Sequence, residues 1–175
     1  MTSLSQLSRI RGRAKLQTLI DREYSGDTDQ FVGAVDREIS RLLRVSLRET
    51  DRLVKTFERL SRFLPARYQP RVYAAKGRLA HWSGDHKNAL FHYNRALSAY
   101  QRERDSLSVA RTRRGLMDVY MYLGKYENAL LEGKQALSYF RRKKMLTDAA
   151  QTMTNIGNVY HRMDNNRQAL RYYDQ

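Results

Sequence analysis

The stretch YLGKYENALLEGKQAL (residues 122–137) contains a turn at Gly124 and then two Ala-Leu steps that lie seven residues apart. The same arrangement occurs forty residues upstream in HWSGDHKNALFHYNRAL (residues 81–97), and its first part recurs forty residues downstream in HRMDNNRQALRYYDQ (residues 161–175). Self-similarity with a period of about 20 to 50 residues is typical of repeat proteins, in which each unit buries its apolar face against the next unit. The period therefore predicts a solenoid.

The spacing inside one unit indicates helices. Small and apolar residues of the first unit recur at i, i+4, i+7, i+8 and i+11, which is one face of a helix with about 3.6 residues per turn. These residues are Ala89, Tyr93, Ala96, Leu97 and Tyr100. A second helical face containing Tyr73 and Gly77 precedes them, and WSGDH separates the two, with Gly84 available for a positive φ. We therefore expect an all-α protein, a right-handed α-solenoid of antiparallel helix pairs.

The pattern resembles the tetratricopeptide repeat, in which a small residue and an aromatic residue of the first helix are followed by alanine, an aromatic residue and alanine in the second. The third unit matches with Ile156, Gly157, Tyr160, Ala169 and Tyr173. The first unit matches with Gly77, Gly84, Ala89, Tyr93 and Ala96. The second unit departs from the pattern, because Met117 stands at the small position and Gly133 at the aromatic position. The repeat length of forty residues is also similar to that of the arrays that precede caspase-like CHAT domains in bacterial proteins.

The period divides the chain into five parts. They are a basic N-terminal helix or arm (1–28), a degenerate helix pair (29–69), two repeats (70–109 and 110–149) and an incomplete third repeat (150–175). We expect one helix over residues 4–24. Ser46 begins a capping box with Glu49, and Asp105-Ser106 and Thr147-Asp148 are expected to cap the helices that follow them.

Composition limits the possible functions. The 33 Lys and Arg residues exceed the 18 Asp and Glu residues, which gives a net charge of +15. Such a field attracts nucleic acid, anionic lipid or an acidic protein, or it serves only to keep the chain soluble. The sequence contains no cysteine and no apolar run long enough to span a membrane, so we expect a cytoplasmic protein without disulfides and without a membrane partner.

No catalytic motif is present, and we expect a protein that is not an enzyme and that needs no cofactor or metal. The sequence around Gly124 lacks the glycine and the Ser or Thr of a phosphate-binding loop. The four histidines, His81, His86, His92 and His161, do not have the spacing of zinc ligands.

By the resemblance to tetratricopeptide repeats, the first helices line a concave groove. The expected peptide-binding residues are Arg71, Arg78, His81, Arg111, Arg114, Asn155, Asn158 and Arg162. Guanidinium groups bind carboxylates and side-chain amides pair with peptide backbone, so this groove favours an acidic protein or peptide partner. Two other interpretations remain: the arginines pair with Asp118, Glu103 and Asp105 and bind nothing, or the basic surface binds nucleic acid such as RNA.

The last repeat stops before its second Ala-Leu step. We therefore expect an exposed apolar face formed by Ile156, Tyr160, Ala169 and Tyr173. A further helix of a longer protein, or self-association, would cover that face. In the first case the array would be the recognition or regulatory arm of a protein with a downstream effector domain. The basic stretch FRRKK (residues 140–144) is consistent with a helix C-terminus, where the helix dipole favours positive charge.

Overall fold

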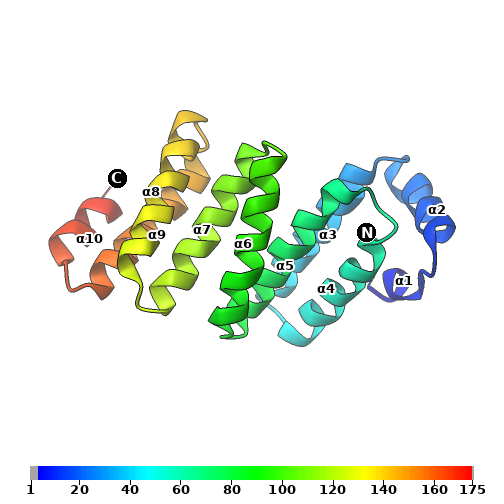
Figure 1. The fold of residues 1–175 in the computed structure, drawn as a ribbon, viewed down its shortest axis with the longest axis horizontal. Helices are drawn as coiled ribbons and strands as arrows, with labels where there is room; N and C mark the ends of the chain where they lie inside the picture. The colour runs from blue at the N-terminus through cyan, green and yellow to red at the C-terminus, as the bar shows by residue number, and fades with distance from the viewer. Residues whose placement is uncertain (1–3, 175) are drawn as a thin grey trace. The chain divides into compact units, whose positions relative to one another are not determined.

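The computed structural model describes residues 4–174, which form ten α-helices and one short 3-10 helix and contain no β-strand (Figure 1). The chain divides into two compact units, residues 1–85 and 86–175. Each unit has its own hydrophobic core. Within each unit, consecutive helices pack against one another, and the all-α solenoid that the period predicts is confirmed.

The first unit contains six helical segments. They are α1 (Leu4–Arg9), α2 (Arg13–Tyr24), α3 (Thr28–Leu42), α4 (Leu47–Ser61), the 3-10 helix η1 (Ala66–Tyr68) and α5 (Gln69–Trp82). The expectation of one helix over residues 4–24 is wrong. Gly12 has a φ of 91°, a conformation outside the helical range, and it separates α1 from α2.

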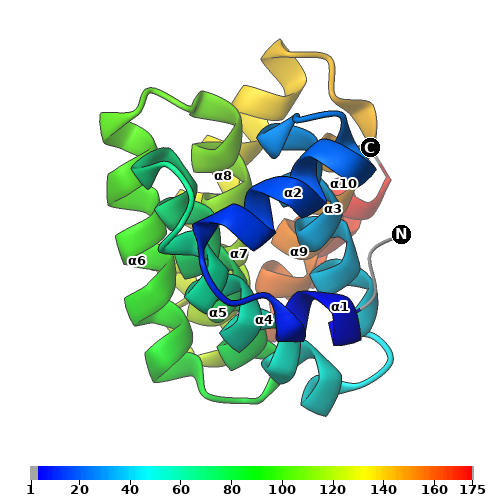
Figure 2. The same cartoon turned by 90° about the vertical axis from the view of Figure 1, so that its right-hand side faces the viewer.

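Arg59 of α4 holds the end of α1. Its guanidinium donates hydrogen bonds to the carbonyls of Ile10 (2.7 Å), Ser8 (3.1 Å) and Leu7 (3.3 Å). These carbonyls lie at a helix end, where backbone acceptors have no partner within the helix. Figure 2 shows α1 beside α4. The break at Gly12 therefore lets a short helix turn onto α4, where one arginine satisfies its last carbonyls.

All helices of the first unit contribute to its core, and the largest share comes from α3 and α4. Its helix faces follow the apolar spacing of the sequence, with Phe31, Val35, Ile39, Leu53 and Phe57 all buried. The predicted cap of α4 is confirmed, since the side chain of Ser46 accepts a hydrogen bond from the backbone N–H of Glu49 at 3.3 Å.

The second unit repeats at forty residues. Its helices are α6 (His86–Arg102), α7 (Ser106–Tyr122), α8 (Tyr126–Arg142), α9 (Leu146–Arg162) and α10 (Asn166–Tyr173). The turns repeat as well. Gly124 and Asp164 have positive φ values after α7 and α9, and Arg104 and Lys144 have positive φ values after α6 and α8.

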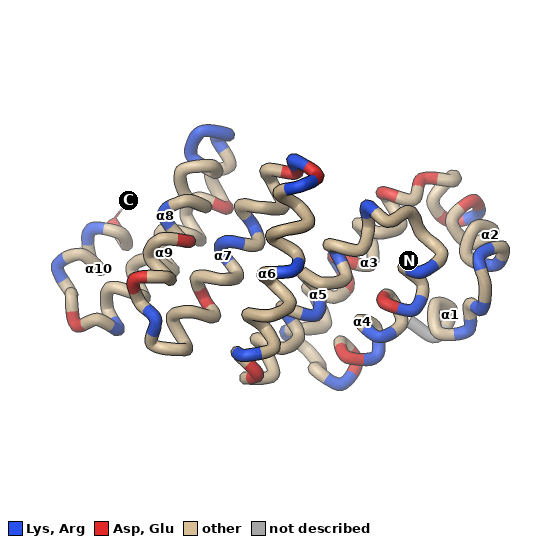
Figure 3. The backbone as a smooth tube through the Cα atoms, viewed as in Figure 1, with Lys and Arg blue, Asp and Glu red and all other residues tan. Residues whose placement is uncertain are grey.

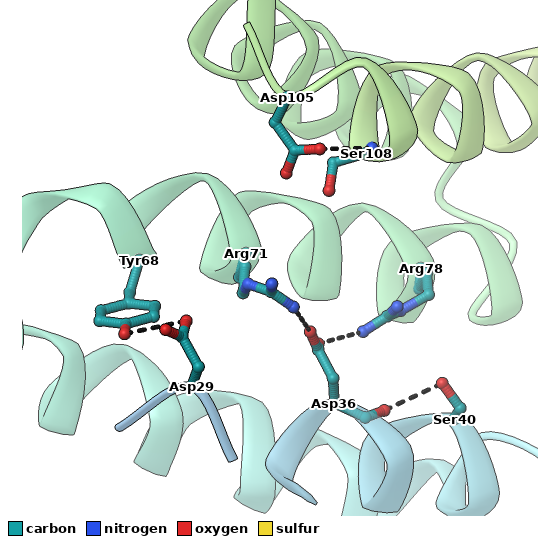
Figure 4. Close-up of polar contacts among 8 residues, drawn as sticks. All are labelled: Asp29, Asp36, Ser40, Tyr68, Arg71, Arg78, Asp105 and Ser108. Atoms are coloured by element: carbon teal, nitrogen blue, oxygen red, sulfur yellow. Dashed lines mark hydrogen bonds and ion pairs between the residues drawn. The ribbon is translucent and has the colours of Figure 1, made fainter. Parts of the chain in front are cut away.

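The two helix caps predicted in this unit have different outcomes. The side chain of Asp105 accepts a hydrogen bond from the N–H of Ser108 at 3.0 Å and caps α7, as predicted (Figure 4). The expectation for α9 is wrong. That helix begins at Leu146 after Met145, which provides no side-chain cap, so Thr147 and Asp148 already lie in its first turn.

A large residue and a small residue have exchanged places in the second repeat. A Cβ atom on Gly157 of α9 would collide with the ring of Tyr173 of α10, which is the family's arrangement of a small residue facing an aromatic one. In the preceding pair the small residue is on the other helix, because a Cβ on Gly133 of α8 would collide with the sulfur of Met117 of α7. The two departures of the second unit from the repeat pattern therefore compensate each other in volume.

The expectation of an exposed apolar face at the last repeat is wrong for two of its residues. Ile156 and Ala169 are buried, Ile156 packing toward Gly133 of α8. Tyr160 is half-buried and stacks on Tyr172, with 5.5 Å between ring centroids. Only Tyr173 is exposed, at 43%. Of the helices between residues 4 and 174, none is both long and apolar enough to cross a membrane.

Candidate functional site

In the first unit, two of the predicted groove arginines bind a single carboxylate. Arg71 and Arg78 of α5 lie 3.1 and 2.9 Å from the two carboxylate oxygens of Asp36 of α3. Figure 4 shows both guanidinium groups pointing toward Asp36. His81, the third predicted residue of α5, is half-buried. The positive charge of α5 is therefore partly compensated by α3.

The second unit has a similar cluster between α7 and α9. Arg114 of α7 lies 2.8 Å from one carboxylate oxygen of Asp148, and Arg111 lies 3.7 Å from the other. Arg114 also donates to the side-chain oxygen of Gln151 at 3.2 Å. Arg114 is mostly buried, whereas the Arg111 side chain is 54% exposed. Arg111 is therefore the more accessible guanidinium of the pair.

Asp118 lies one to two helical turns further along α7 and accepts a hydrogen bond from the side-chain amide of Asn155 at 2.9 Å. Burial between the two helices raises the pKa of Asp118 to about 7. The charge of Arg114 and the hydrogen bond from Asn155 act in the opposite direction, but they do not offset the desolvation. Asp118 is thus a carboxyl group that changes its charge near neutral pH.

The remaining predicted residues of α9 lie near its C-terminal end. Asn158 accepts a hydrogen bond from the hydroxyl of Tyr173 at 2.8 Å. The guanidinium of Arg162 lies over the ring of Tyr122, 5.0 Å from its centroid. The side chains along these two helices are referred to below as the α7–α9 face. Its members are Arg111, Arg114, Asp118, Asp148, Gln151, Asn155, Asn158 and Arg162.

The two carboxylates that organise these clusters, Asp36 and Asp148, were not expected from the sequence. The sequence suggested Asp118, Glu103 and Asp105 as partners of the arginines, whereas these ion pairs are made by Asp36 and Asp148. Asp148 was interpreted as a helix cap. Asp148 lies in the first turn of α9, whereas Arg111 and Arg114 lie in the second and third turns of α7, so the forty-residue period alone does not predict these ion pairs.

The histidines take part in local packing. His86 stacks on Tyr122 with 5.0 Å between ring centroids, His92 contacts Phe91, and a ring nitrogen of His161 lies 3.0 Å from the side-chain oxygen of Asn166. Within the part of the chain that the structure describes, no group of three His, Cys, Asp or Glu side chains is arranged to hold a metal ion.

The helices form pairs that repeat every forty residues, and polar side chains line one face of the first helix of each pair. This arrangement defines an α-solenoid of helical repeats. Residues 68–142 match the family model of the tetratricopeptide repeat, and the resemblance is confirmed over this segment. The chain is similar to the crystal structure of BtubC (BKLC) from P. vanneervenii, with a TM-score of 0.68 and 19% identity over 98% of this chain and 72% of that chain. At this identity the similarity shows the fold alone. The comparison with curated proteins gives no match.

Proposed function

We propose that the chain is a protein-interaction scaffold whose α7–α9 face binds an extended segment of a partner protein. The general role rests on the tetratricopeptide repeats, since helical repeats of this kind present extended surfaces to other proteins. We locate the binding site on this face because guanidinium and amide groups continue along α7 and α9, the first helices of two successive pairs.

The chemistry of the α7–α9 face suits a peptide backbone with a small number of carboxylates. Gln151 and Asn158 are exposed, and each side-chain amide carries both a donor and an acceptor, as a peptide bond does. Arg111 is exposed and lies at 3.7 Å from Asp148, so an incoming carboxylate competes for it at small cost. Arg114 stays paired with Asp148 in this arrangement. The expected ligand is an extended peptide with one or two acidic residues.

Nucleic-acid binding is the alternative that the net charge of +15 suggests. Single-stranded RNA binding uses exposed aromatic rings that alternate with basic residues along one face. On the α7–α9 face the exposed ring of Tyr122 is already covered by Arg162 on one side and stacks with His86. The arrangement therefore favours a peptide over a nucleic acid.

The experiment measures binding of the full chain to a library of extended peptides that differ in their number of Asp and Glu residues. Arg111→Ala removes the exposed guanidinium and leaves the Arg114–Asp148 pair intact, and Arg111→Ala with Arg114→Ala removes both. We expect the double variant to bind about tenfold more weakly. Arg167→Ala is the matched control, because it removes one exposed positive charge from α10, outside this face.

Two results would contradict the proposal. One is equal binding by the Arg111→Ala variant and the Arg167→Ala control, each of which removes one exposed positive charge. The other is micromolar affinity for single-stranded RNA with a steep dependence on salt and no affinity for any peptide, which would establish the nucleic-acid alternative. A circular dichroism melt of each variant separates a lost contact from a lost fold.

The array is further proposed to act as the recognition arm of a larger protein with an effector domain. This part of the proposal is supported only by the sequence similarity to arrays that precede CHAT domains, and the coding sequence beyond the codon for Gln175 tests it.

A further inference from the structure

The second unit contains a cavity of about 500 Å³ between the end of α6, the first half of α7 and the end of α8. Its lining includes three arginines and two tyrosines, namely Arg104, Arg113, Arg142, Tyr100 and Tyr139. Arg113 belongs to α7 but reaches α8, where it lies 2.6 Å from a carboxylate oxygen of Glu132. Arg111 and Arg114 of the same helix reach α9 instead. The cavity is therefore separate from the α7–α9 face.

The charge of the cavity is strongly positive. None of the ten residues that line it is an Asp or Glu. Arg113 is compensated by Glu132, but no carboxylate between residues 4 and 174 lies within ion-pair distance of Arg104 or Arg142. Arg142 lies over the ring of Tyr139 at 5.9 Å. The two uncompensated guanidinium groups share the cavity with a third, and each has donors available for an anion.

Further positively charged residues surround the cavity. Arg142 is part of the basic run Arg141–Lys144 at the α8–α9 turn, and Arg104 lies in the α6–α7 turn. Both turns lie at the same end of the unit, the upper end in Figure 3, where the α8–α9 turn appears as a continuous blue stretch. The helix dipole of α8 accounts for a positive charge at its C-terminus, but not for the contribution from the neighbouring turn.

We propose that this cavity binds an oxyanion side chain, a carboxylate or a phosphoryl group, of an acidic segment from a partner protein. Arginine is suited to both groups because its planar guanidinium donates two parallel hydrogen bonds to a pair of oxygens. The volume exceeds that of a free inorganic anion and accommodates a side chain together with its backbone. Nucleic acid fits less well, since Tyr100 is only 5% exposed and Tyr139 is half-buried, so neither ring is open to a stacked base.

The turns provide a test in which loss of binding is separated from loss of folding. Arg104 and Lys144 both have positive φ values, 57° and 54°, one repeat apart. Glycine adopts this conformation without the steric penalty of a Cβ atom, so Arg104→Gly and Lys144→Gly are both expected to fold. Each variant removes one positive charge from the same end of the unit. Arg104 lines the cavity and Lys144 does not, which makes the two a matched pair.

The experiment uses the full chain at physiological salt and four probes: a fluorescent polyglutamate peptide, the same peptide with a central phosphoserine, a single-stranded oligouridylate and vesicles containing phosphatidylserine. We expect the wild-type protein to bind at least one of the two peptides more tightly than the other probes. Arg104→Gly is expected to weaken that binding about tenfold, and Lys144→Gly by less than about twofold, because exposed charges outside the cavity are screened. The stronger of the two peptides identifies the oxyanion as carboxylate or phosphoryl.

Arg142→Gln gives a second, independent measurement, since it removes the charge and keeps the aliphatic stem of the side chain with a neutral polar end. The proposal is overturned if Arg104→Gly and Lys144→Gly weaken binding equally, because the affinity would then come from overall charge. It is also overturned if neither peptide binds, or if the oligouridylate or the vesicles bind more tightly than both peptides. Arg111→Ala leaves this cavity intact, so failure of the proposed peptide face and failure of this site are distinguishable.

Discussion

Asp118 makes the stability of the protein depend on pH in a direction opposite to that of most carboxylates. Its pKa is raised to about 7 by burial, whereas the unfolded chain has a value near 3.8. Between these values the folded protein holds a proton that the unfolded chain has released, so the free energy of unfolding decreases as the pH rises. From about pH 5 to about pH 8 the linkage amounts to about 2.5 kcal/mol, and partial exposure of the site reduces this to about 2 kcal/mol.

Asp118→Asn removes this titration and keeps a side-chain oxygen that accepts the hydrogen bond from Asn155. We expect the stability advantage of the variant over the wild type to be about 2 kcal/mol larger near pH 8 than near pH 5, because the wild type loses stability over this range and the variant does not. Urea unfolding followed by circular dichroism at both pH values measures the difference. Asp164→Asn, which removes an exposed carboxylate from the same unit, controls for the change in net charge. If the difference in stability between Asp118→Asn and the wild type is the same at both pH values, the assignment of a protonated carboxyl group is refuted.

Two further predictions concern packing and capping in the second unit. Gly133→Tyr alone should destabilise the fold by about 2 kcal/mol or more, because the new ring meets Met117, and Met117→Gly in the same chain should recover part of that loss. A double-mutant cycle by urea unfolding measures the coupling, and additive effects would show that the two positions are not complementary. Asp105→Ala should cost about 1 kcal/mol by removing the cap of α7, whereas Ser106→Ala should leave the thermal midpoint nearly unchanged. Equal midpoints for both variants would contradict the role of Asp105.

The repeat period was sufficient to predict the architecture, because the small residues that allow helices to approach recur at fixed positions. Ala89, Ala129 and Ala169 are all buried as their spacing indicates. The period did not predict the break at Gly12, since that segment lies outside the repeats and its path depends on a distant arginine of α4. Local patterns reveal which face of a helix is buried, but they do not reveal which side chain on another helix a given group will meet.

The residues predicted to line a groove illustrate the same limit. Their arginines lie on α5, α7 and α9, but the identity of their carboxylate partners depends on how successive helices are aligned along their lengths. Asp148 lies 34 residues after Arg114 in the sequence and 2.8 Å from it in space. The basic cavity was not predicted at all, since its arginines come from three different segments. Of the residues that make the cavity basic, only Arg142 belonged to a run that stood out in the sequence, residues 140–144. The dipole of the helix that ends there was enough to explain the charge of that run.

The exchange of volume between Met117 and Gly133 has a consequence for how copies of this chain assemble. Neighbouring repeats of similar sequence are prone to exchange helices, either within one chain or between two chains, because one second helix closely resembles another. Here the Met117 side chain fits against a helix with glycine at the facing position, and Tyr173 of α10 would overfill the same space. An exchange would therefore overfill the contact of α7 with α10 and leave a void between α9 and α8, where Gly157 would face Gly133. The departure of Met117 and Gly133 from the repeat pattern therefore favours the correct pairing of helices during folding.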